Sequence, residues 1–358
     1  MKTPFWKKIQ LEKRKQRIIK VGFLLLLLLL SVLVITILKV LVKNLTVPSE
    51  SKKCWTEKMD MSRTNRVNIV FDIEPLLVFS FEKKEKEGTI LLIPEDYYFK
   101  KGTEVYRLGS FFELGEMKDG CGGRFLKKTI EDFLAVPIDR YIKVRSGKWE
   151  ALPAGRQVGS GKEVEVFVKK IQSWGWFFRF LGNYKKFGEN FETDFSLLEI
   201  FRLWWQAKDL RWEKVAFQTL EGSSVVVEDK LPDGTKVKTV DQNLLPEKIS
   251  KLFGDSQIEG EGIKIEVLNT TQKPGLGQKV GLVVNNLGGD LIHIGNWPEA
   301  LKTTQIWVIN KKVKDSYTCQ RLAEVFGAEV FLKPEIEEAR GDLLILLGED
   351  YAKKILRY

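Results

Sequence analysis

Three short apolar runs follow one another from Arg66, and their alternating hydrophobic and polar positions predict three β-strands. Their sequences are RVNIVFD, PLLVFSFE and GTILLIPED. The charged segment KKEKEG separates the second run from the third and ends in Gly88, which is typical of a tight turn. We therefore expect the second and third strands to form an antiparallel hairpin.

Apolar residues then change to helical spacing. In residues 123–144, Phe125 and Ile130 fall on one helical face, and Pro137 predicts that the helix ends before another strand begins. In TDFSLLEIFRLWWQAKDL, Ser196 and Glu199 have the spacing of a capping box, so a helix is expected there. Its aromatic residues, with those of SWGWFFRFLGNY, suit a core or membrane-facing packing better than a ligand cage. Strands are expected around LPDG, and residues 145–190 follow no pattern that places them.

The last hundred residues repeat a compact pattern of strands and helices. Strands are predicted at 264–268, 290–294, 305–309, 328–332 and 342–348, with helices at about 275–287 and 316–327. This order predicts a small α/β domain with helices on a mixed sheet. Its first turn, Asn269, Thr270 and Thr271, could face a phosphate at the helix N-terminus. Because no GxGxxG or GK[ST] pattern is present, an ordinary polar turn near Pro274 or Gly275 is favoured.

The N-terminal region carries the longest apolar stretch of the chain. Val21–Leu38 has no charged residue, and continued to Val42 it is long enough to cross a bilayer as a helix. A cleaved signal peptide is the alternative, but no small-x-small cleavage pattern follows. We therefore expect residues 1–20 to form a basic cytoplasmic tail, 21–42 a transmembrane signal anchor and 43–62 a linker, with the bulk of the chain extracytoplasmic.

Net charge changes this picture little. The chain carries +10, and seven of these charges lie in residues 1–20 beside the apolar stretch. A nucleic-acid-binding protein spreads basic charge over a folded face, so nucleic acid is not an expected partner. The tail instead suits an anionic inner leaflet.

Cysteine and histidine are scarce. A Cys54–Cys121 disulfide is permitted outside the membrane, but the odd count of three slightly favours free, buried thiols. The one histidine, His293, lies in an alternating strand pattern where a packed side chain is the common outcome. The sequence therefore gives no basis for a zinc site.

The C-terminal segments resemble the C-terminal domain of LytR-CpsA-Psr envelope proteins. Five pieces carry the resemblance in the right order. They are Val267-Leu268-Asn269-Thr270-Thr271, Gly275-Leu276, Gly295-Asn296, Thr304-Gln305-Ile306 and Leu347-Gly348-Glu349-Asp350-Tyr351.

The upstream region resembles the main domain of the same family more weakly, through SRTNRVNIVF, GTILLIPEDYYF, TIEDFLAVPIDRYIKV and ETDFSLLEIFRLWW. The resemblance implies signal-anchored proteins that transfer a glycopolymer from a polyprenyl-diphosphate carrier to peptidoglycan. It also implies a divalent metal and a set of Arg and Asp residues. The organisation expected from it is α/β (α+β): an LCP-like domain at 63–253, a linker at 254–262 and a LytR C-terminal-like domain at 263–358.

The departures from the family pattern fall where its chemistry should be. Asn65 stands where the family has an Asp, and Glu95 where it has an Arg, although Asp96 remains. Replacing Arg by Glu reverses the charge offered to a diphosphate. The favoured hypothesis is a catalytically silent envelope protein that binds wall glycopolymer, carrier lipid, peptidoglycan or an envelope partner.

The alternative hypothesis is a working phosphotransferase that uses Mg²⁺. Asp96 and Arg63 are then the catalytic candidates, and Asp96 the metal candidate. Arg107, Arg124 and Arg140 could bind the diphosphate, although ordinary surface charges are favoured for these three. Asn269, Thr270 and Thr271 are the candidates for a ligand of the C-terminal domain.

Overall fold

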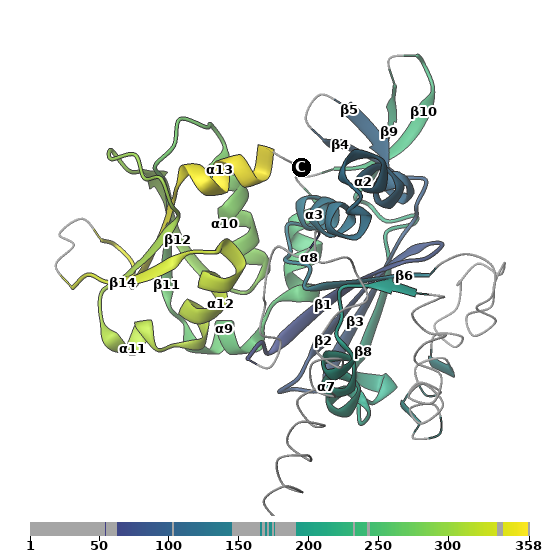
Figure 1. Ribbon diagram of the computed structural model, residues 1–358, viewed down its shortest axis with the longest axis horizontal. Coiled ribbons are helices and arrows are strands. Elements are labelled where there is room, and N and C mark those ends of the chain that lie inside the picture. Colours follow the sequence, from purple (N-terminus) through teal and green to yellow (C-terminus); the bar gives the residue numbers. More distant parts are fainter. Residues whose placement is uncertain are drawn as a thin grey trace, which may run out of the picture.

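The computed structural model describes Cys54 and residues 63–101, 104–144, 191–231, 233–241, 244–334 and 339–356, with the isolated positions 165–166, 169, 172–173 and 175. Within these ranges the chain forms two α/β domains side by side, each built on its own main sheet (Figure 1). The mixed α/β class predicted from the sequence is confirmed. No helix in the described ranges is both long and apolar enough to cross a membrane, and the anchor predicted at 21–42 lies outside them.

The N-terminal domain is built on a six-stranded sheet of order β7-β6-β1-β2-β3-β8. Strand β2 is antiparallel to both β1 and β3, while β6 is parallel to β1 and β8 is parallel to β3. The carboxyl ends of β1, β3, β6 and β8 therefore meet at one edge. The strands are β1 (Arg66–Asp72), β2 (Leu76–Glu82), β3 (Glu87–Ile93), β6 (Arg140–Val144), β7 (Phe191–Thr193) and β8 (Val215–Thr219).

Both faces of this sheet are covered, as the alternation along β1 requires. Val70 faces the main core with helices α2, α3 and α8, whereas Val67 and Ile69 face α7. Figure 1 shows α7 on the side of the sheet away from α2 and α3. The helices are α2 (Phe111–Asp119), α3 (Gly122–Leu134), α7 (Leu197–Ala207) and α8 (Leu245–Phe253).

The predicted hairpin is confirmed as β2–β3, and the capping box of Ser196 and Glu199 is confirmed at the start of α7. Two small hairpins and two 3-10 turns are further elements of the part of this domain that the structure describes. They are β4 (Tyr98–Lys101) with β5 (Glu104–Arg107), β9 (Val226–Lys230) with β10 (Lys236–Val240), η2 (Leu108–Ser110) and η3 (Trp212–Lys214).

The C-terminal domain has a five-stranded sheet of order β12-β11-β15-β13-β14. Strand β13 is antiparallel to β15 and the other pairs are parallel, so the predicted mixed sheet is confirmed. Its strands are β11 (Lys264–Asn269), β12 (Asp290–Asn296), β13 (Gln305–Val308), β14 (Glu329–Leu332) and β15 (Leu343–Leu347). Its helices are α10 (Leu276–Asn286), α11 (Lys311–Lys314), α12 (Tyr317–Phe326) and α13 (Glu349–Leu356).

The segment 254–262, expected as a linker, instead contains helix α9 (Ser256–Glu261). Asp255 caps its N-terminus by accepting a hydrogen bond from the Gln257 N–H, and Gly262 ends it with φ of 56°. An Asp N-cap and a left-handed glycine are ordinary helix boundaries. The sequence signals were present, but the short helix between them has too few apolar residues to show a period.

The two domains contact each other through buried polar groups. The Tyr317 hydroxyl donates to Asp255 Oδ2 at 2.7 Å and accepts the Asn65 N–H at 2.8 Å. The side chain of Asn286, 1 % exposed, donates to the carbonyl oxygens of Leu134 and Ala135 at 3.1 Å each. These carbonyls lie at the C-terminal end of α3. Asn286 of the C-terminal domain therefore caps a helix of the N-terminal domain.

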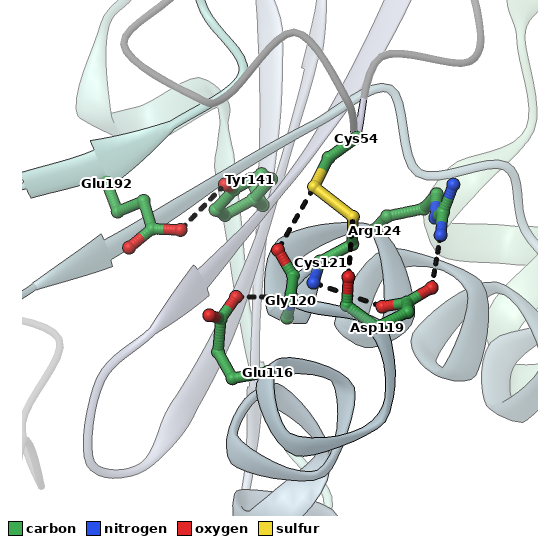
Figure 2. The surroundings of a disulfide bond; sticks show 9 residues. Cys54, Glu116, Asp119, Gly120, Cys121, Arg124, Tyr141 and Glu192 are labelled. Carbon is green, nitrogen blue, oxygen red and sulfur yellow. Dashed lines mark hydrogen bonds and ion pairs between the residues drawn. A yellow bond between two sulfur atoms is a disulfide. The ribbon is translucent and has the colours of Figure 1, made fainter.

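Cys54 and Cys121 form a disulfide with their Cα atoms 5.4 Å apart (Figure 2). Cys121 directly precedes α3. Its N–H donates to Asp119 Oδ1 at 3.0 Å, and the Gly122 N–H donates to Glu116 Oε1 at 2.7 Å. The expectation of free thiols is therefore wrong for these two residues, while Cys319 is free and buried. An odd count cannot show which two of three cysteines the fold brings together.

Candidate functional site

Charged side chains gather at the carboxyl edge of the N-terminal sheet. β1 ends in Asp72, and the parallel register places Lys143 of β6 beside it. The Lys143 ammonium donates to Asp72 Oδ2 at 2.8 Å and to Glu113 Oε1 at 2.5 Å, and it lies 3.9 Å from the centre of the Phe112 ring. Because Glu113 belongs to α2, two strands and a helix meet at this ammonium.

The charges of this group depend on each other. Burial raises the pKa of the Asp72 carboxyl above its ordinary value, and the hydrogen bond from Lys143 offsets only part of that. Burial disfavours the Lys143 ammonium, but its two carboxylate partners outweigh this and raise the pKa of Lys143. The ammonium therefore stays charged at neutral pH and is held by carboxylates.

Glu95 follows β3 at the same edge and pairs with Arg107. The guanidinium donates from Nη2 to Glu95 Oε1 at 2.6 Å and from Nε to the Glu95 carbonyl at 3.2 Å. Burial raises the pKa of Glu95, the hydrogen-bonded carboxyl of Glu74 raises it further, and Arg107 lowers it. The charge of Asp72 also raises the pKa of Glu95. The carboxyl groups around Lys143 therefore interact with those around Arg107.

We call these six side chains the strand-end cluster: Asp72, Glu74, Glu95, Arg107, Glu113 and Lys143. Its four carboxyl groups outnumber its two cations. Both cations already bind carboxylates, at distances of 2.5–2.8 Å. The cluster can share protons between carboxyl groups, but it does not present a free cationic surface.

Of the residues singled out in the sequence, Arg107 belongs to this cluster and Asp96 adjoins it. Asp96 directly follows Glu95 and is exposed, and the next residue, Tyr97, is buried. Burial raises the pKa of Tyr97, and the Asp96 charge raises it further. Across the described ranges, no group of three or more His, Cys, Asp or Glu side chains is placed to hold a metal ion.

Arg63 lies at the opposite edge of the sheet from Asp96. It precedes β1, whose first residue, Arg66, pairs with Glu82 at the end of β2. The carboxyl end of β3 is instead level with Leu76 at the start of β2. A strand of seven residues spans roughly 20 Å, so the structure does not bring Arg63 and Asp96 together.

Asn65 is two residues after Arg63 and lies in the interface between the domains. Its amide donates to Asp255 Oδ1 at 2.8 Å and to Glu82 Oε1 at 3.0 Å. The resemblance compares Asn65 with an Asp of a metal site. In this chain it has a structural role instead, since it joins β1 to α9.

Arg124 and Arg140 each bind a carboxylate elsewhere in the domain. Arg124 pairs with Asp119 beside the disulfide (Figure 2). Arg140 is buried and donates to Glu199 Oε1 of α7 at 2.5 Å. With Arg107 they form three separate ion pairs rather than one diphosphate site.

The turn after β11 is closed by its own side chains. Asn269 Oδ1 accepts the N–H and the hydroxyl of Thr271 at 3.0 and 2.8 Å, and its amide donates to the Lys273 carbonyl. The Thr270 hydroxyl donates to the Leu347 carbonyl at 2.6 Å. Gly275, with φ of 77°, then begins α10. This geometry is that of an ordinary polar turn, as favoured from the sequence.

A small cleft of about 60 Å³ lies between the domains, where α3 faces α10 and α13. The residues that line it include Pro137 and Val283. Charged residues of both domains also line it, among them Lys279, which pairs with Asp132 at 2.8 Å. The volume suits a few water molecules rather than a polymer.

Sequence reasoning missed most of the strand-end cluster. Asp72 is the last residue of a predicted strand and Lys143 the last but one of another. Charged residues at the carboxyl ends of strands are a signal for a site that the sequence analysis could have used. Glu113 had no such signal, because helix α2 was not predicted.

The geometry defines a two-domain α/β protein in which a small mixed-sheet domain is docked on a larger one. Residues 262–351 match the family described as LytR cell envelope-related transcriptional attenuator. The C-terminal domain is therefore a LytR-type C-terminal domain, as the sequence resemblance implied. A comparison with curated protein sequences finds no match.

Solved structures match the chain over about half of its length. TagV of B. subtilis is 18 % identical, with 51 % of this chain and 94 % of that chain covered and a TM-score of 0.39. A transcriptional regulator from Enterococcus faecalis is 14 % identical, with 55 % and 89 % covered and a TM-score of 0.41. TagT bound to LIIa-WTA is 14 % identical, with 57 % and 95 % covered and a TM-score of 0.39.

Proposed function

We propose that this chain is an extracytoplasmic cell-envelope protein of the LytR-CpsA-Psr type that binds a wall glycopolymer or an envelope partner and does not itself transfer the polymer. Residues 21–42 anchor it in the membrane, with residues 1–20 in the cytoplasm. The LytR-type C-terminal domain at 262–351 supports the envelope assignment.

The disulfide supports the location. Cys54 and Cys121 are 4 % and 2 % exposed, so the bond is enclosed by the domain. Disulfides persist outside the cytoplasm and are rare within it. Cys54 lies only twelve residues after Val42, so this part of the chain belongs to the same side of the membrane as the domain.

The strand-end cluster is the observation that carries the proposed lack of transferase activity. A diphosphate needs cationic donors that are available to it. Here Arg107 is bound to Glu95, and Lys143 is bound to Asp72 and Glu113. An incoming diphosphate would have to displace these carboxylates and would face the excess negative charge of the cluster.

The test compares polyprenyl-diphosphate binding by the full chain in nanodiscs, with and without Mg²⁺, for three proteins. They are the wild type, Glu95→Arg and Glu87→Arg. Glu87 is the matched control because it is an exposed carboxylate at the other end of the same strand. We expect no binding by the wild type or by Glu87→Arg beyond that of an unrelated anionic lipid, and a gain in Glu95→Arg.

Binding by the wild type that requires Mg²⁺ and is lost in Asp96→Ala would overturn the proposal in favour of a phosphotransferase. The same proteins are then assayed for transfer of glycopolymer to peptidoglycan. Transfer by the wild type would contradict the proposal directly, whatever the binding result.

A further inference from the structure

The two edges of the C-terminal sheet differ. Strand β14, at one edge, has four residues and is followed by Lys333 and Pro334, a charged residue and one without an N–H. Short length, charge and proline keep an edge strand from pairing with another chain. Strand β12, at the other edge, has seven residues, and within the described ranges it pairs with β11 alone. Of the two edges, β12 is the one that these features do not protect.

The backbone of β12 offers hydrogen-bonding groups on its outer side. The Trp297 N–H, one residue past the strand, donates to the Asn269 carbonyl of β11 at 2.9 Å. Successive residues of a strand direct their backbone groups to alternate sides, so those of Ile294 and Asn296 face away from β11. These two residues present two N–H donors and two carbonyl acceptors to a further strand.

The side chains of β12 are apolar for an exposed strand. None of its seven side chains is buried, although Leu291, Ile292 and Ile294 are among them. Ile292 and Ile294 are 40 % and 36 % exposed. A bulge at Ile292 is the one irregularity, and the stretch from His293 to Asn296 is regular. An exposed, uncharged edge of this kind is a template for another strand.

We propose that β12 pairs antiparallel with β12 of a second copy of this chain, about a two-fold axis at Ile294. The axis places Ile294 opposite Ile294 of the second copy. The other opposed pairs are His293 with Gly295 and Ile292 with Asn296. Because a shift of one residue would turn each side chain to the other face, the axis also fixes the register.

The edge is complementary to itself, as a contact between identical surfaces requires. Across the axis, the two Ile294 residues exchange both of their backbone hydrogen bonds. The Ile294 side chain lies against Gly281 of α10, so the pairing extends the apolar packing of that face into the second copy. Asp290, the one charged residue of β12, lies at opposite ends of the two strands, so the like charges do not meet.

The paired stretch is short, with residues 292–296 of each strand facing one another. Such a contact is weak in dilute solution, so this inference rests in part on the membrane anchor proposed above. Copies anchored in one membrane are confined to its plane, which raises their effective concentration. A two-fold axis along the membrane normal keeps both anchors on the same side. The pairing leaves the proposed binding of a wall polymer unaffected.

The experiment is cysteine cross-linking of the full chain in phosphatidylcholine vesicles, with Ile294→Cys and, as the matched control, Leu332→Cys. Leu332 is 44 % exposed on β14, the other edge of the same sheet. Residues of a hydrogen-bonded antiparallel pair have Cα atoms about 5.5 Å apart, which a disulfide accepts. The native Cys319 is fully buried and the other two cysteines are bonded, so the introduced thiol is the one that reacts.

We expect mild oxidation to cross-link Ile294→Cys several-fold more than Leu332→Cys. An equal mixture of Ile292→Cys and Asn296→Cys should cross-link several-fold more than either variant alone, because the axis places these two positions opposite each other. Adding Ile294→Lys to both members of the mixture should reduce the cross-link several-fold, since two ammonium groups then meet at the axis. Circular dichroism confirms that the lysine variant is folded.

Equal cross-linking at 294 and 332 would overturn the inference, because random collision does not distinguish the two edges. Cross-linking of Ile292→Cys alone to the same extent as the mixture would overturn the proposed register and with it the two-fold pair. Flotation separates these results from failure of the anchor. Chains that float and do not cross-link at 294 exclude the pairing and retain the proposed membrane location. If the chains do not float, the proposed anchor fails, and the same cross-linking at high protein concentration decides the pairing by itself.

Discussion

Arg321 of α12 and Asp139, the residue before β6, form an ion pair across the domain interface. The guanidinium Nη2 lies 3.0 Å from Asp139 Oδ1, and each side chain is 1 % exposed. The other oxygen of Asp139 accepts the N–H of Asn68 in β1 at 2.6 Å. One carboxylate therefore connects the C-terminal domain to two strands of the N-terminal sheet.

Loss of Arg321 should strongly destabilise the protein. Arg321→Met leaves the Asp139 carboxylate buried without its cation, which costs about 3–5 kcal/mol of unfolding free energy. Urea unfolding followed by circular dichroism measures the change. The control is Lys353→Met, which removes an exposed pair with Glu349 and should cost less than about 1 kcal/mol. Equal losses in the two variants would contradict the role given to the buried pair.

Asn286→Ala should destabilise by about 1–3 kcal/mol, because the last carbonyls of α3 lose both donors within a buried interface. The neighbouring Asn285→Ala is the control, since Asn285 is exposed on the same helix. It should change the unfolding free energy by less than about 0.5 kcal/mol. Hydrogen exchange at the end of α3 should accelerate in the first variant only; unchanged protection there would argue against the cap.

Glu82 should make the stability sensitive to acid. Burial raises the pKa of its carboxyl, but the hydrogen bonds from Ser256 and the charge of Arg66 lower it by more, so the folded pKa lies below 4.5. The unfolded state therefore binds the proton more readily. The stabilisation is present above about pH 4.5 and is lost as the pH falls through the folded pKa.

Unfolding free energies measured between pH 7 and pH 3 test this relationship. Glu82→Gln should be less stable than the wild type at neutral pH, and its stability should fall less steeply below pH 4.5. Parallel curves for the two proteins would show that Glu82 does not contribute to the slope.

The disulfide should account for two of the three thiols. In denaturant without reductant, an alkylating reagent should add once, at Cys319, and after reduction three times. Cys54→Ser and Cys121→Ser should each cost about 2–4 kcal/mol of unfolding free energy. The double variant should cost no more than either alone, because the same bond is lost. Additive losses would indicate that the two residues are not bonded to each other.

Local pattern was enough to predict most of the strands and the main helices. Alternation gave β1, β2 and β3, and capping chemistry gave the start of α7. Helices α2 and α8 were missed, as were the short α9 and α11 and the terminal α13. In α2, FFELGEMKD, a central glycine and scattered apolar positions blur the helical period. The order of the strands in the sheet was not predicted. The position of β8 next to β3, for example, depends on packing between segments distant in the sequence and has no local sequence signal.

At the candidate site, too, features with a local sequence signal were predicted and features that depend on tertiary packing were not. Resemblance drew attention to Glu95 and Asp96, which follow β3 at an edge of the sheet set by a hairpin visible in the sequence. It also joined Arg63 and Asp96 in one list of candidates, although the register of β1 against β2 places them at opposite edges. Pairing of Lys143 with Asp72 and Glu113 required the tertiary structure, since these residues come from β6, β1 and α2.

The disulfide also decides how tension would travel through the molecule. If the chain is pulled from its N-terminal side, the covalent path divides at Cys54: one branch follows residues 55–62 into β1, and the other crosses directly to Cys121. The second branch has the fewer bonds and carries the pull to the junction of α2 and α3. Strand β1, at the centre of the sheet and beside the domain interface, is thereby relieved of part of a pull applied to the N-terminal side of the chain.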